Sequence, residues 1–151
     1  MSPSFLSWAG LVGVAAGLLG ALSAVVMLLW PPQVAEELVS YPFTTVGFYI
    51  AQGWFFIHHV GLVLVLVALA QSGAVGNGRL ERGGAWTAVI GMVALTLCEL
   101  LAMRYADWNT ATANAGLMGI CYGISVTVSG LGMLAAGIGV LRAGVWHRWR
   151  R

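Results

Sequence analysis

The stretch "GWFFIHHVGLVLVLVALA", residues 53–70, places two adjacent histidines, His58 and His59, inside an otherwise apolar run. One carboxylic acid, Glu99, lies inside another apolar segment. Ionisable groups are costly in hydrocarbon, so each one inside a membrane-spanning segment is a candidate functional residue. A histidine and a carboxyl group in a dry pocket are suitable partners for acid–base catalysis. We therefore predict His59 and Glu99 as the catalytic residues of a proton transfer on a lipid-soluble substrate.

Helical spacing groups further residues with this pair. Gln52 and His59 are seven residues apart and share a helix face, whereas His58 leaves the helix about 100° away. We expect His59 on the floor of a polar cleft, Glu99 on its wall, and His58 against a neighbouring helix, although a small rotation of the helix would exchange the two histidines. The residues predicted to bind the ligand are Gln52, Arg104 and Asp107 at the rim, Trp54, Phe55 and Tyr122 on the apolar walls, and His58.

The same residues also have a purely structural interpretation. In it, His59 pairs with Glu99 or with a backbone carbonyl only to hold helices together, an interaction that averages about 0.6 kcal/mol in membranes. No metal site is predicted, because adjacent histidines face different ways and no H-x-x-x-H motif or carboxylate triad accompanies them.

A haem site is a separate alternative. Both histidines within apolar segments lie on one segment, and His147 lies beyond the last one, which argues against haem ligation by two histidines of one chain. Ligation by a histidine and a methionine stays open, with Met92, Met118 or Met133 as the second ligand.

Composition identifies the environment of these residues. The 151-residue chain is 60 % hydrophobic and 8 % charged, whereas a soluble domain carries about 25 % charged residues. We expect an integral membrane protein whose surroundings are membrane lipids and which has no nucleic-acid partner. All seven basic residues are arginine, which indicates a GC-rich, bacterial genome and hence the bacterial cytoplasmic membrane.

Four segments reach the roughly 20 apolar residues that a membrane-spanning helix needs: about 5–30, 45–72, 85–104 and 112–142. The prolines of "WPPQ" at 30–33 end the first, because proline lacks a backbone donor. Polar stretches at 72–84 and 104–116 separate the others. The chain is therefore predicted to be all-α: one transmembrane domain, residues 1–151, folded as a four-helix bundle.

The arginines predict the orientation of this bundle. Arg79 and Arg82 lie in the second loop, and a second group lies at the end of the chain: Arg142, Arg148, Arg150 and Arg151. Loops rich in arginine stay on the cytoplasmic side. We therefore expect both termini in the cytoplasm, with the first and third loops outside.

Glycines form two further patterns. They recur every seven residues in the last segment, at Gly116, Gly123, Gly130, Gly137 and Gly144. A similar row of small residues lies in the first: Gly10, Gly13, Gly17, Gly20 and Ala24. Helices in lipid associate at small residues, where their backbones can approach closely. We expect these rows to pack within the bundle; the alternative is a homodimer or a contact with a larger membrane complex.

Together these features predict a multi-pass membrane protein with an outward-opening polar cleft that binds a small lipid-soluble molecule of isoprenoid, sterol or quinone-like type. The alternatives are a non-catalytic accessory subunit of a larger membrane complex and a haem-binding membrane protein. No particular cofactor is predicted. The chain has no serine-nucleophile or phosphate-loop motif, which disfavours hydrolysis and phosphoryl transfer. The residues alone do not decide whether it is an enzyme.

Overall fold

The computed structural model describes residues 3–144, with side chains from residue 5 onward. Its long helices are α1 (Pro3–Leu29), α2 (Thr45–Gln71), α3 (Arg79–Ala102) and α4 (Ala113–Ala143), and a short 3-10 helix, Met103–Tyr105, continues α3. The described part of the chain contains no β-strand beyond a single bridge. The predictions for His147 and for Arg148, Arg150 and Arg151 concern residues outside the described part of the chain.

All four long helices are long and apolar enough to cross a membrane. This confirms the all-helical prediction with four membrane-length helices. α3 begins at Arg79, six residues before the predicted apolar segment. Its first turn contains Glu81, and an acidic residue there stabilises the helix N-terminus through the helix dipole.

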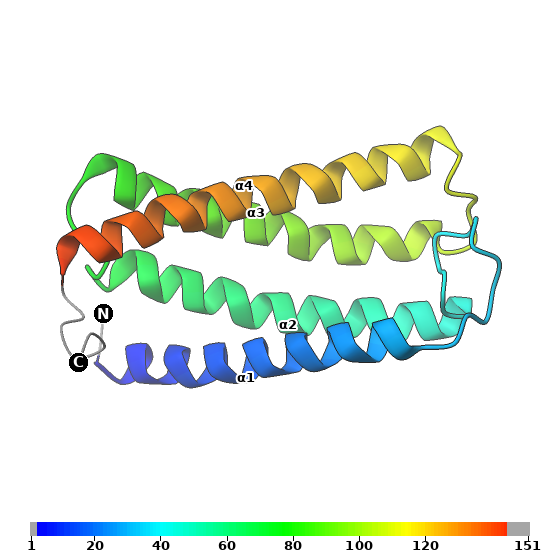
Figure 1. Ribbon diagram of the computed structural model, residues 1–151, viewed down its shortest axis with the longest axis horizontal. Coiled ribbons are helices and arrows are strands. Elements are labelled where there is room, and N and C mark those ends of the chain that lie inside the picture. The colour runs from blue at the N-terminus through cyan, green and yellow to red at the C-terminus, as the bar shows by residue number, and fades with distance from the viewer. Residues whose placement is uncertain (1–2, 145–151) are drawn as a thin grey trace.

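The four helices lie side by side in an open arrangement (Figure 1). The most extensive interface joins α3 to α4, the next joins α2 to α3, and α1 packs on α2. Among the described residues, α1 and α4 share no packed interface, so the bundle is not closed into a ring. Only 6 % of the apolar window of α1 is buried, because its single contacting face meets one neighbour.

Close packing of α3 on α4 depends on small residues in both helices. A Cβ atom added at Gly132 of α4 would lie 2.7 Å from the carbonyl oxygen of Gly84 in α3. One added at Gly91 of α3 would lie 2.8 Å from Cα of Ser129 in α4. The Ser129 hydroxyl also donates a hydrogen bond to the carbonyl of Ala88, at 3.3 Å. Backbone contact therefore holds these two helices together.

The seven-residue glycine row of α4 does not take part in this packing. A Cβ added at Gly116, Gly123, Gly130 or Gly137 would meet no atom within 4 Å. The prediction that this row packs within the bundle is therefore wrong. A different row faces α3 instead, with the alternating three- and four-residue spacing of one helix face: Ser125, Ser129, Gly132, Ala136 and Gly139.

The glycine row of α1 divides between two faces. An added Cβ at Gly13 would lie 2.8 Å from a methyl group of Val65, and one at Gly20 would lie 2.5 Å from the ring of His58, so both glycines pack against α2. Gly10 and Gly17 have no atom within 4 Å of such a Cβ. The packing prediction is therefore correct for Gly13 and Gly20 and wrong for the other two.

Segments 30–44 and 103–112 form a structure at one end of the helices, here called the cap (Figure 1). A β-bridge joins Leu38 to Asn109, and the amide of Val39 donates to the carbonyl of Trp108 at 3.0 Å. The hydroxyl of Thr45 hydrogen-bonds Asp107. The loop at residues 72–78 lies at the opposite end, together with the first residues of α1 and the last of α4.

Candidate functional site

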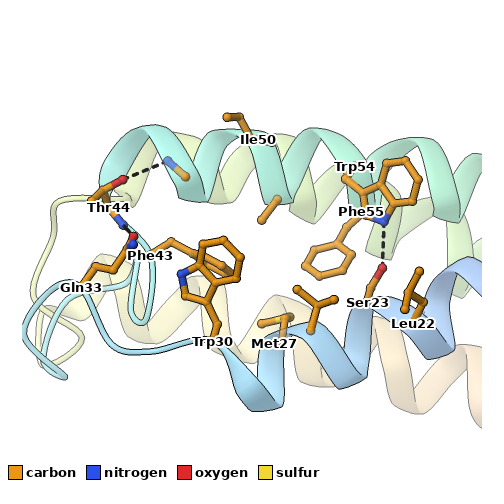
Figure 2. A pocket seen from close by; sticks show the side chains of 13 residues that line it. Leu22, Ser23, Met27, Trp30, Gln33, Phe43, Thr44, Ile50, Trp54 and Phe55 are labelled. Carbon is orange, nitrogen blue, oxygen red and sulfur yellow. Dashed lines mark hydrogen bonds between the residues drawn. The ribbon is translucent and has the colours of Figure 1, made fainter.

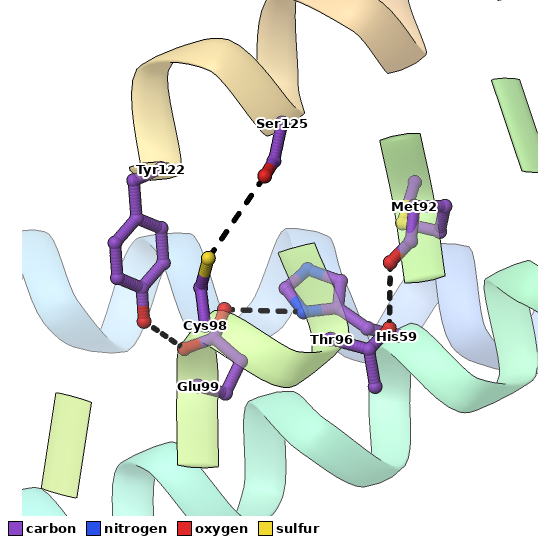
Figure 3. Close-up of polar contacts among 7 residues, drawn as sticks. All are labelled: His59, Met92, Thr96, Cys98, Glu99, Tyr122 and Ser125. Carbon is purple, nitrogen blue, oxygen red and sulfur yellow. Dashed lines mark hydrogen bonds and ion pairs between the residues drawn. The ribbon is translucent and has the colours of Figure 1, made fainter. Parts of the chain in front are cut away.

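Glu99 occupies the centre of a polar cluster on three helices. Its side chain projects from α3 and the residue is only 4 % exposed. The hydroxyl of Tyr122, on α4, donates a hydrogen bond to Oε2 at 2.7 Å. Nδ1 of His59, on α2, lies 3.2 Å from Oε1 (Figure 3). Each oxygen of the carboxyl group therefore faces a partner from a different helix.

The helical period places Glu99 toward the interior. Ala88, Met92, Leu95 and Ala102 are buried on the same side of α3, at three- and four-residue intervals from Glu99. Thr96, one turn before, is also buried, but its hydroxyl donates to the carbonyl of Met92 within the same helix at 2.7 Å (Figure 3). Thr96 is therefore satisfied without the cluster.

Gln52 completes the cluster from α2. It is 7 % exposed, and its side chain interacts with the hydroxyl of Tyr122. We use the name polar cluster for Gln52, His59, Glu99 and Tyr122. Sequence spacing places Gln52 and His59 on one helix face, and the structure brings both to the same group of residues.

Two atoms of the polar cluster retain hydrogen-bonding capacity. Oε1 of Gln52 and Nδ1 of His59 are buried and have no hydrogen-bond partner among the described residues. For His59 the distance to Glu99 is that of an ion pair, but the direction of the contact does not meet hydrogen-bond geometry. A buried polar group without a partner costs about 1–3 kcal/mol. Each of these two atoms therefore has hydrogen-bonding capacity that no described residue uses.

His58 faces a different helix. Its Nε2 packs against Gly20 of α1, where an added Cβ would lie only 2.5 Å away, and the ring also contacts the backbone of Ala16. The ring centroids of His58 and His59 are 4.9 Å apart. The two histidines thus diverge from α2 as their 100° separation predicts, and His59 is the one beside Glu99.

The other predicted site residues are distributed over three places. The Phe55 ring lies beside His59, with 6.5 Å between the centroids. Trp54 faces α1, and its Nε1 donates to the hydroxyl of Ser23 at 2.8 Å. Asp107, in the cap, accepts a hydrogen bond from Thr45 at the start of α2, and Arg104 is exposed. The structure therefore brings neither predicted charged rim residue to the polar cluster.

An apolar core extends from the cap to the polar cluster. Phe43, Phe48, Ala102, Ala106 and Met118 form it, with Ala51 and Tyr122 packed against it. This core lies at the end of the helices where the sequence predicts the opening of the cleft.

A cavity of about 530 Å³ lies instead between α1 and α2 on the cap side (Figure 2). Phe55 and Trp54 line it, together with Trp30, Phe43 and Ser23. Ser23 is not among the residues predicted from the sequence, where its one signal is a hydroxyl within an apolar segment. In the structure this hydroxyl accepts the hydrogen bond of Trp54.

Side chains that bind metal ions are spread out over the described residues. No group of three or more His, Cys, Asp and Glu side chains comes together within residues 5–144. The arrangement at Glu99 is that of an acid–base pair, with imidazole and carboxyl groups in contact and a phenol holding the carboxyl in place.

The described residues form four helices long and apolar enough to cross a membrane, which indicates a multi-pass membrane protein, and an imidazole and a carboxyl group lie in contact between α2 and α3. The chain matches no protein-family model, no curated protein and no solved structure.

Proposed function

We propose that this protein binds a small lipid-soluble molecule with a polar head, of isoprenoid, sterol or quinone-like type, and that His59 and Glu99 exchange a proton with that head. One observation carries the proposal. A nearly buried carboxyl group is contacted from two other helices, while neighbouring atoms of Gln52 and His59 have hydrogen-bonding capacity left. A cluster that served only to join helices would be expected to satisfy its own members.

Each residue of the polar cluster has a distinct part in this proposal. Tyr122 holds one oxygen of Glu99, which leaves the other directed at His59. His59 and Glu99 supply the proton donor and acceptor, and the head's oxygen or nitrogen takes up or releases that proton. Gln52 Oε1 accepts a hydrogen bond from the head.

The proposal includes an orientation in the bacterial cytoplasmic membrane. Arg79, Arg82 and Arg142 lie at the end of the helices opposite the cap. The positive-inside rule favours this end in the cytoplasm and the cap outside. Because an apolar core extends from the cap to the polar cluster, the ligand would approach from the lipid, past Phe55, and not through the cap.

Mass spectrometry of the lipophilic molecules that co-purify with the protein tests the proposed function. Wild-type protein should retain a polar-headed, lipid-soluble species after gentle detergent extraction. Glu99→Gln and His59→Ala should each lower its amount by about tenfold or more, since a buried polar group that loses its hydrogen-bond partner costs about 1–3 kcal/mol. Thr96→Val is the matched control, because Thr96 is buried one turn away but hydrogen-bonds within its own helix.

The amount of retained ligand is compared among wild type, Thr96→Val and the two cluster variants. Equal retention by wild type, control and both cluster variants would refute the proposed function. Folding is checked by size-exclusion chromatography, so that loss of the ligand is not confused with loss of the fold.

The outward-facing glycines of α4 favour a second function, that of an accessory subunit or homodimer. Four glycines at seven-residue intervals leave bare backbone on the surface of α4, and helices in lipid associate at such surfaces. Gly123→Leu and Gly130→Leu should reduce co-purification of a partner or dissolve a dimer, whereas Ile124→Leu, at an exposed position of the same helix, should not. Unchanged assembly in both glycine variants would exclude this function.

A further inference from the structure

The helices α1 and α2 approach each other closely at individual glycines and leave a cavity between them nearer the cap. They are close where Gly20 meets His58 and where Gly61 meets Ala16, at 3.3 Å from an added Cβ. Toward the cap they enclose the cavity of about 530 Å³ (Figure 2). Sites for small molecules typically have volumes of about 300–1,000 Å³, so this cavity is large enough for a ligand.

Aromatic rings line the cavity from α2 and from the cap. Trp30 and Phe43 belong to the cap, Trp30 directly after the last residue of α1, and Trp54 and Phe55 lie on α2. The rings of Trp30 and Phe43 are packed against each other, with centroids 5.3 Å apart at 53°. Aromatic faces interact favourably with other planar rings in offset or edge-to-face geometry. A saturated hydrocarbon chain gains no such geometric preference.

The polar atoms of the cavity are few and have fixed positions. The hydroxyl of Ser23 accepts from Nε1 of Trp54 at 2.8 Å and donates to the carbonyl of Leu19 at 2.7 Å. These bonds hold the Trp54 ring at the inner end of the cavity (Figure 2). On the other side, Phe55 lines the cavity and also lies beside His59 of the polar cluster.

We infer that the cavity between α1 and α2 binds a planar conjugated ring of a lipid-soluble molecule, a quinone-like ring, between Trp30 and Trp54. Phe55, which lines the cavity and lies beside His59, then stands next to this ring. The inference rests on the proposed function for the role of the polar cluster, but the cavity itself is an independent feature. The ring enters from the lipid, because Leu22, Val26 and Ile50 at the cavity are exposed on the outside of the helices.

Tryptophan fluorescence quenching by 2-methyl-1,4-naphthoquinone tests the inference on the full chain in detergent micelles. Wild-type protein should show saturable quenching. Val26→Phe places a larger side chain in the cavity at a position that is 43 % exposed, so the fold can accommodate it. We expect it to raise the apparent Kd about tenfold or more. Val25→Phe is the matched control: Val25 is the preceding residue, is 53 % exposed and does not line the cavity.

Two results would overturn the inference. The first is an equal Kd for Val26→Phe, Val25→Phe and wild type. The second is displacement of the quinone by equimolar palmitate, which would show that the cavity prefers a hydrocarbon chain to a ring. Glu99→Gln separates the inference from the proposed function. Binding that is lost in Val26→Phe but unchanged in Glu99→Gln, at every pH measured, supports the ring site and refutes proton exchange at the polar cluster.

Discussion

The substitution Gly132→Ala tests the packing of α3 on α4, because it adds a single Cβ atom to α4 at the surface that contacts α3. The added Cβ would lie 2.7 Å from the Gly84 carbonyl oxygen and 2.8 Å from Cα of Ala88. Ordinary van der Waals contact begins at 3.4 Å, so α3 and α4 would have to separate by at least about 0.7 Å. Both atoms belong to backbone, which cannot move aside as a side chain does. Overpacking of this kind costs about 1–3 kcal/mol.

Gly130→Ala is the control for this substitution. It lies two residues away on the same helix, and its added Cβ would meet no atom within 4 Å. Alanine favours the helix over glycine by about 1 kcal/mol at either position. Because that gain is common to both variants, the difference between them isolates the contact with α3.

The free energy of unfolding in mixed detergent and SDS micelles, followed by circular dichroism, is the measurement. Gly132→Ala should be about 1–3 kcal/mol less stable than Gly130→Ala. Equal stability of the two variants would refute the assignment of α4 faces. Lower stability of Gly130→Ala would show that the seven-residue row, and not the Gly132 row, packs against the bundle.

Three further predictions concern α1, the polar cluster and the orientation. Gly20→Ala should be about 1 kcal/mol less stable than Gly17→Ala, because its Cβ would lie 2.5 Å from the His58 ring whereas that of Gly17 meets no atom within 4 Å, and this difference should disappear when both variants also carry His58→Ala. Tyr122→Phe should cost about 1–3 kcal/mol in unfolding free energy by leaving an oxygen of Glu99 without a donor; no change would mean that water replaces the phenol. Gly78→Cys should escape a membrane-impermeant thiol reagent in intact cells, whereas a cysteine in the segment joining α1 to α2 should react; the reverse pattern would invert the proposed orientation.

The polar cluster was largely predictable from the sequence. Gln52 and His59 were assigned to one face from their spacing, and Glu99 because it is the one acid inside an apolar segment. Tyr122 was expected nearby as an apolar wall; its hydroxyl instead bonds to Glu99. Which atom a side chain presents to its neighbour depends on helix rotation and spacing, and these do not follow from the periodicity of one helix.

Hydropathy and helix-breaking residues act locally, and for that reason the sequence by itself determined the four helices and the segments between them. The 3.6-residue period likewise determined which residues share a face, including the divergence of His58 from His59. Only the tertiary structure decided which face meets which neighbour. Regular spacing marked Gly116, Gly123 and their row as a packing surface, yet Gly132 and the serines of α4 contact α3. Almost every face of these helices is apolar, so sequence pattern does not distinguish a face that packs on protein from one that is exposed. Which face packs on protein depends on how closely whole helix surfaces fit together. Among the described residues, the same fit places α1 against α2 and against no other long helix, with a cavity between the two.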